Sequence, residues 1–108
     1  MSMDQSDVLA KYRELGEQEK VRFLLMVCHW LTVGARDAYS EGTVENPAKL
    51  VQANEVQHRL TGIALEVAGQ RCVRTDTEIA AFLFTGFAEV GALDLLEEVI
   101  KGWPLRGG

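Results

Sequence analysis

Four polar residues interrupt an apolar segment in the middle of the chain and are its first candidates for chemistry. The apolar residues from Leu50 to Val67 recur at helical spacing, and the polar residues on or beside their stripe are Asn54, Gln57, His58 and Thr61. Buried polar groups are costly unless they are hydrogen-bonded. These four residues, the polar seam, therefore form either a hydrogen-bonded layer that fixes helix register or the lining of a pocket between helices.

Glu55 and His58 form an E-x-x-H motif within the same segment. The motif resembles half of the paired motif of ferritin-like di-iron bundles, in which i, i+3 spacing aims both ligands at one metal. That family needs a second such motif and further glutamates on facing helices, whereas this chain has one copy. A homodimer could supply the second copy, so a metal site at Glu55 and His58 is an alternative hypothesis. Our first expectation is that the protein uses no cofactor.

Arg22, His29 and Arg36 are spaced seven residues apart in an otherwise apolar segment. At about 100° per residue they share one helical stripe. Such a stripe could bind an anionic ligand or the acidic face of another helix. The other interpretation is an ordinary exposed side, where arginine stems cover apolar surface and Glu97 and Glu98 supply partners from the same chain.

The two cysteines, Cys28 and Cys72, are far apart and lack C-x-x-C spacing. We expect free thiols in a reducing compartment, with the cytoplasm as the default because the start of the chain lacks a secretory signal pattern. Cys72 has Arg71 and Arg74 as neighbours, a setting that would lower a thiol pKa. No Ser-His-Asp or Cys-His arrangement can be assembled, and phosphate-binding glycine motifs are absent. The sequence favours a non-catalytic protein over an enzyme.

The longest apolar block, from Val21 to Tyr39, predicts the central helix that positions these residues. The middle of its broad apolar face is predicted to hold Phe23, Val27, Trp30, Leu31, Gly34 and Ala38. A membrane span needs roughly 20 uninterrupted apolar residues, and Arg22, His29, Thr32 and Arg36 interrupt this block. We therefore expect a buried bundle helix and no membrane partner.

Two helices are predicted in the first part of the chain. Ser6 is a suitable N-cap for a short helix from Asp7 to Leu15, which Gly16 stops. The central helix is expected to begin at Glu17, where a carboxylate suits the positive end of the helix dipole, and to end at Gly42.

Three more helices are predicted in the second part. Asn46 is a good N-cap for a helix over 47–68, which has Pro47 at its first position and Gly69 as its left-handed cap. Thr75 and Glu78 have the spacing of a capping box, which predicts a helix that Gly91 ends or kinks. The last helix is expected over 92–101.

Together these elements predict an all-α, four- to five-helix bundle with one long, mostly buried central helix. The central helix and helix 47–68 form an antiparallel pair, and the last two helices cover it. With 108 residues and 47% hydrophobic residues, the chain fits a single domain over 1–103, followed by a flexible tail over 104–108. The formal net charge of -5 argues against nucleic acid as a main partner, because such binding requires a basic surface.

The apolar surface predicts a small binding or regulatory module that self-associates through apolar helix faces. Besides the central helix, four aromatic residues add more apolar surface than a small bundle easily hides, namely Phe82, Phe84, Phe87 and Trp103. Symmetric homodimers are the commonest assembly, so Phe82, Phe84 and Arg36 are interface candidates, and another protein is a possible partner. The alternative is a metal- or small-ligand-binding bundle, possibly an enzyme, that uses Glu55, His58 and the rest of the polar seam.

Overall fold

The predicted all-α bundle is confirmed by a computed structural model, which describes residues 3–40 and 47–103. Its five helices are α1 (Gln5–Glu14), α2 (Glu17–Ser40), α3 (Pro47–Ala68), α4 (Asp76–Glu89) and α5 (Leu93–Gly102). No strand occurs in these ranges. Among the described helices, we find none with the length and apolar character needed to cross a membrane.

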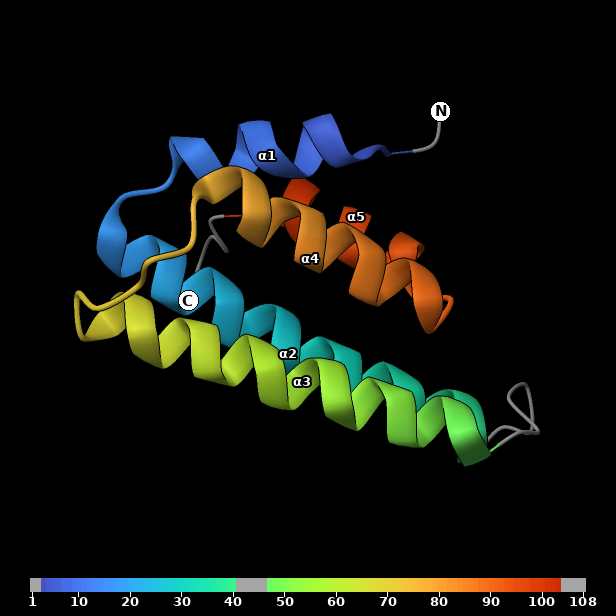
Figure 1. Ribbon diagram of the computed structural model, residues 1–108. Coiled ribbons are helices and arrows are strands. Elements are labelled where there is room, and N and C mark those ends of the chain that lie inside the picture. Colours follow the sequence, from blue (N-terminus) through green and yellow to red (C-terminus); the bar gives the residue numbers. More distant parts are fainter. Residues whose placement is uncertain (1–2, 41–46, 104–108) are drawn as a thin grey trace.

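The helices form two layers. The predicted antiparallel pair of α2 and α3 makes one layer, while α1, α4 and α5 make the other (Figure 1). In agreement with prediction, the last two helices cover the pair, since α4 contacts α3 and α5 contacts α2. The first helix packs on α4, which is distant in sequence. This leaves one side of the α2–α3 pair without a covering layer.

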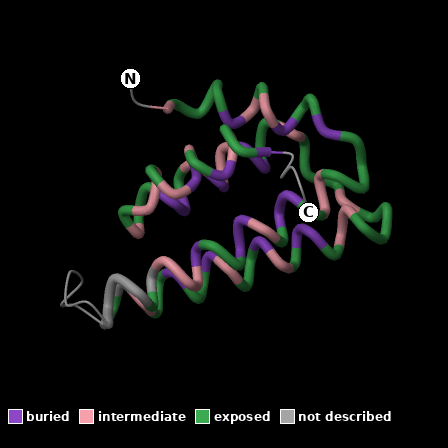
Figure 2. Tube along the Cα trace, turned by 180° about the vertical axis from the view of Figure 1, so that it is seen from behind, coloured by how far each residue is buried: buried purple, intermediate pink, exposed green. Residues whose placement is uncertain are grey.

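The hydrophobic core lies between the two layers, where the buried stretches of the helices face one another (Figure 2). The apolar stripe predicted on α3 is confirmed by the burial of Ala53, Val56, Leu60, Ile63 and Ala64. Helix α4 buries Ile79, Leu83 and Phe87. The largest buried side chains of α2 are Phe23, Leu24, Val27 and Leu31.

Trp30 departs from the predicted apolar face of α2. The sequence places it in the middle of that face, but it is 40% exposed. Its indole borders a shallow pocket between α2 and α5 that Met26, Leu95 and Val99 also line. Periodicity alone predicted burial, but the α5 residues beside the ring leave it partly exposed. The side chain of Ala38, predicted on the same face, lies outside the described part of the structure.

The start of α1 corrects the predicted N-cap. Asp4, and not Ser6, caps the helix. Its carboxylate accepts a hydrogen bond from the Asp7 backbone N–H at 3.0 Å, and the Asp7 carboxylate accepts one from the Asp4 N–H at 2.9 Å. This reciprocal capping box satisfies two backbone donors, so the helix begins at Gln5 and not at Asp7.

Both α3 and α4 end in the hydrogen-bond pattern of a Schellman motif. The predicted left-handed cap at Gly69 is wrong, because Gln70 takes the positive φ, 56°. The Gly69 N–H still donates a helical hydrogen bond to the Leu65 carbonyl. The Arg71 N–H donates to the Glu66 carbonyl at 2.9 Å, which completes the motif. In α4 the predicted break at Gly91 is confirmed by its φ of 72°.

The other predicted helix ends are only partly covered by the described residues. Helix α3 begins at Pro47 as predicted, and the Thr75 hydroxyl caps α4 by accepting from the Glu78 N–H at 3.1 Å. The last helix begins at Leu93, one residue later than predicted. The predicted cap at Asn46 and the predicted helix end at Gly42 lie outside the described residues.

Candidate functional site

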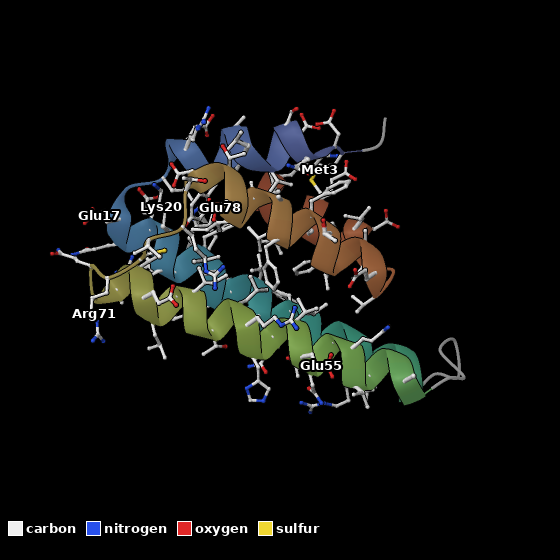
Figure 3. All side chains as sticks on the ribbon, in the orientation of Figure 1. Met3, Glu17, Lys20, Glu55, Arg71 and Glu78 are labelled. Carbon is white, nitrogen blue, oxygen red and sulfur yellow. The ribbon has the colours of Figure 1, made fainter. Side chains whose placement is uncertain are left out.

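The sequence candidates on α2 and α3 gather on the uncovered side of the helix pair. Figure 3 shows Glu55 on the side of α3 that points away from α4. Arg22, His29 and Arg36 are exposed on α2, and Asn54 and His58 are exposed on α3. Their helical positions lie opposite the buried stripes of the two helices. The arginine stripe and part of the polar seam therefore share one surface.

The other two members of the polar seam contact Cys28 at the α2–α3 interface. The Thr61 hydroxyl donates to the Gln57 carbonyl at 2.8 Å and lies 3.8 Å from the Cys28 sulfur. The Cys28 sulfur in turn is 3.7 Å from the Gln57 carbonyl oxygen. Burial raises the pKa of the Cys28 thiol, and the contact with Thr61 partly offsets this. The thiol is therefore protonated, and these contacts tie α2 to α3 in one register.

Large apolar side chains also lie on the uncovered side. Leu25 of α2 is 46% exposed, Leu65 of α3 is 66% exposed and Val51 of α3 is 57% exposed. Cys28 of α2 lies against Thr61 of α3. Leu25 is about one turn before Cys28, and Leu65 is about one turn after Thr61. Because the two helices are antiparallel, Leu25 and Leu65 lie at the same level of the pair. We call this surface the outer face and define it by Arg22, Leu25, His29, Arg36, Val51, Asn54, His58 and Leu65.

The predicted interface residues Phe82 and Phe84 lie elsewhere. Both are half-buried on α4 and pack against the hydrophobic core. Phe82 lines a shallow pocket between α3 and α4 together with Arg59, Ile63 and Glu66. The structure thus does not bring these two phenylalanines together with the outer face.

The geometry of a metal site at Glu55 and His58 is incomplete within one chain. Both residues are exposed on α3. Among the described residues, no group of three or more histidine, cysteine, aspartate or glutamate side chains is arranged to hold a metal ion. Ligands from a second copy would be needed to complete such a site.

A polar cleft that the sequence did not predict lies where α1, the start of α2, the end of α3 and the start of α4 meet. Its volume is about 370 Å³, and we call it the Tyr12 cleft. It is lined by Tyr12, Glu17, Lys20, Val67, Gln70, Cys72, Arg74, Asp76 and Ile79. Figure 3 shows Glu17 and Lys20 at this end of the bundle.

Lys20 stands at the centre of the charged contacts in this cleft. Its ammonium nitrogen lies 3.3 Å and 3.5 Å from the two Asp76 carboxylate oxygens and 5.0 Å from the centroid of the Tyr12 ring. The ammonium therefore combines an ion pair with a cation–π contact. The Arg74 guanidinium is paired with Glu66 at 3.7 Å.

Tyr12 is completely buried, yet its hydroxyl has no hydrogen-bond partner among the described residues. Burial raises the pKa of the phenol, and the nearby Asp76 and Cys72 raise it further. The hydroxyl is therefore protonated at neutral pH. An unpaired buried hydroxyl is costly, and no described residue offsets that cost at Tyr12.

Sequence reasoning missed the cleft because its residues come from four separate segments. Tyr12 fits the apolar stripe of the first helix, and Lys20 and Asp76 are separated by most of the chain. The one local signal was Cys72 between arginines. The structure places Cys72 half-buried in the cleft, with its sulfur 3.9 Å from the Arg74 carbonyl oxygen.

Comparison with protein-family models, curated proteins and solved structures found no match for this chain. Function is therefore argued from the geometry of the outer face.

Proposed function

We propose that the protein is a small non-catalytic binding or regulatory module that forms a homodimer through the outer face. The observation that carries the proposal is the distribution of exposed apolar side chains. Five large hydrophobic residues are exposed in the described part of the chain, and three of them, Leu25, Val51 and Leu65, belong to the outer face. Adjacent exposed apolar side chains of this kind are typical of interaction sites.

The charges on the outer face suit a second copy of the same chain. In a two-fold interface the same patch meets itself, so that α2 of one copy can lie against α3 of the other. The α2 side carries Arg22, His29 and Arg36, and the α3 side carries Glu55 one helical turn from Val51. This arrangement brings cations toward a carboxylate and leucines toward apolar partners, which favours pairing and its orientation.

The fold leaves this face open. The second layer covers the opposite side of the α2–α3 pair, and the hydrophobic core is closed between the layers without help from the outer face. A dimer of this kind would add a layer to the bundle. The free thiols at Cys28 and Cys72 suit the reducing cytoplasm that we propose as its location.

The test is native mass spectrometry and sedimentation equilibrium on the double variant Leu25→Glu/Leu65→Glu. Together these leucines expose roughly one whole side chain, so burying them contributes about 1.5–3 kcal/mol per copy. Losing this contribution from both copies weakens the dimer by about 100-fold or more. Val73→Glu is the matched control, because Val73 is 93% exposed and lies outside α2 and α3.

We expect wild type and Val73→Glu to be dimers and the double variant to be a folded monomer. A wild-type monomer, or a double variant as dimeric as wild type, would refute the outer face as the interface. The same spectra test the alternative metal site. A mass excess that disappears in His58→Ala would favour metal or ligand binding at Glu55 and His58.

A further inference from the structure

We propose that the outer-face dimer binds two zinc ions, each held by Glu55 and His58 of one copy and by His29 of the other copy. This inference rests on the proposed self-association, because the third ligand of each site comes from the partner. It is carried by the positions of His29 and His58, which are the two histidines of the chain.

The two histidines lie at about the same level of the α2–α3 pair. The sulfur of Cys28 is 3.7 Å from the Gln57 carbonyl oxygen and 3.8 Å from the Thr61 hydroxyl, which fixes Cys28 against this part of α3. His29 directly follows Cys28, and His58 directly follows Gln57. With a rise of about 1.5 Å per residue, the two histidines are level to within about one helical turn.

Both histidines face away from the hydrophobic core. Each of them is exposed. The residues two positions before and two positions after each histidine are buried, and positions two apart point to nearly opposite sides of a helix. His29 and His58 therefore lie along the middle of the side that the second layer leaves open.

The symmetry of the dimer brings His29 of one copy to His58 of the other. A two-fold axis parallel to the helices places α2 of one copy against α3 of its partner. Rotation about such an axis leaves every residue at its own level along the helices. Because His29 and His58 are level within one copy, the partner's His29 faces His58, and the same contact occurs a second time across the axis.

Glu55 completes the set of ligands. It precedes His58 by three residues on α3, a spacing that makes the two side chains neighbours on one helix face. Among the described residues, no cation pairs with Glu55. Two imidazoles and one carboxylate form a common ligand set of Zn²⁺, which takes a water molecule as its fourth ligand.

The cations of the outer face are placed so that they do not oppose the metal. Arg22 and Arg36 each stand seven residues from His29, which is about 10 Å along the helix. Repulsion between an exposed arginine and the ion is largely screened over such a distance at physiological salt.

The first test measures self-association of the full chain with and without zinc. We expect protein stripped of metal with EDTA to form dimers and, after addition of zinc chloride at neutral pH, to show two zinc ions per dimer by native mass spectrometry. Free zinc at about ten times its dissociation constant should lower the dimer dissociation constant about 100-fold, because each of the two sites contributes about tenfold. Sedimentation equilibrium measures this change.

Glu55→Gln should weaken the uptake of zinc. Glu19→Gln is the matched control, because Glu19 is an exposed carboxylate in the first turn of α2 that does not belong to the outer face. This control should take up two ions per dimer as wild type does.

Mixing two inactive variants tests whether the ligands come from different copies. His29→Ala and His58→Ala each remove one ligand from both sites of a homodimer, so neither variant alone should take up zinc. In a heterodimer of the two, one site keeps Glu55 and His58 from the first variant and His29 from the second. With one variant labelled with heavy nitrogen, native mass spectrometry of the mixture should show a heterodimer that carries one zinc ion.

The possible results separate the zinc site from the dimer itself. A metal-free wild type that is monomeric would refute the outer-face dimer and the zinc site with it. A wild-type dimer that Leu25→Glu/Leu65→Glu dissociates, but that takes up no zinc, would overturn the zinc site alone. The zinc site is also overturned if the mixed variants take up no zinc, or if His29→Ala alone still binds two ions per dimer.

Discussion

Two glycines inside helices, Gly62 in α3 and Gly86 in α4, provide a test of how closely the two layers pack. Replacing a helical glycine by alanine stabilises a helix by about 1 kcal/mol when the new methyl group meets nothing. A Cβ atom at exposed Gly62 would meet no atom within 4 Å apart from the adjoining backbone of its own helix and its chain neighbours. We therefore expect Gly62→Ala to stabilise the protein by about 0.5–1 kcal/mol.

Gly86→Ala should cancel this gain or destabilise the protein. A Cβ atom there would lie 3.0 Å from one methyl carbon of Val56 and 3.5 Å from the other. Valine has one strongly preferred rotamer in a helix, so Val56 cannot turn away at low cost. Overpacking of this kind costs about 1–3 kcal/mol, which exceeds or cancels the gain in helix propensity. Gly86→Ala should thus be about 1–3 kcal/mol less stable than Gly62→Ala.

Thermal and urea denaturation followed by circular dichroism would measure this difference. For a domain of about this size, each kcal/mol corresponds to roughly 4–8 °C in melting temperature. All samples need the same protein concentration, because self-association would shift the melting temperature by mass action. If Gly86→Ala proves as stable as Gly62→Ala, the contact with Val56 does not set the distance between α3 and α4.

Two further predictions concern the Tyr12 cleft and its neighbourhood. Gln70 has a φ of 56°, and this conformation costs a residue with a side chain about 1–2 kcal/mol. Gln70→Gly should therefore raise the urea concentration at the unfolding midpoint. A lower midpoint would show that the Gln70 side chain stabilises the loop. The pKa values of Cys28 and Tyr12 are raised from ordinary values of 9.0 and 10.0, so the unfolded chain loses these protons first and the free energy of unfolding falls as pH rises above about 9. Tyr12→Phe should flatten the part of that fall above pH 10, as urea titrations at several pH values would show; an unchanged slope would contradict the assigned burial of the phenol.

The sequence predicted helix ends correctly where the residue that sets the end acts on backbone atoms close to it in sequence. Pro47, Thr75 and Gly91 act on backbone atoms within a few residues of themselves, and each stands at the helix end that it predicted. The apolar stripe of α3 could also be predicted, because one face of that helix is buried and its apolar residues recur at helical spacing. The prediction of Ser6 as the first N-cap was wrong, because Asp4, another residue with a side-chain acceptor, caps the helix.

The candidate sites were less predictable, because they depend on which helices meet. Trp30 has the periodicity of a core residue, yet its exposure is decided by the position of α5. Asn54 and Thr61 are close in sequence, but one is exposed and the other contacts Cys28 across the helix interface. The pairing of Lys20 with Asp76 has no counterpart in any local pattern.

The packing of α1 on α4 has a consequence for the order in which the protein folds. α2 and α3 are neighbours in sequence and can pair with little loss of loop entropy. The partner of α1 is separated from it by residues 15–75. During synthesis Val8 and Tyr12, both fully buried in the finished fold, can therefore be buried completely only after α4 has left the ribosome. The Lys11 ammonium then donates to the Trp103 carbonyl at 2.7 Å, so the first helix made is among the last to reach its place.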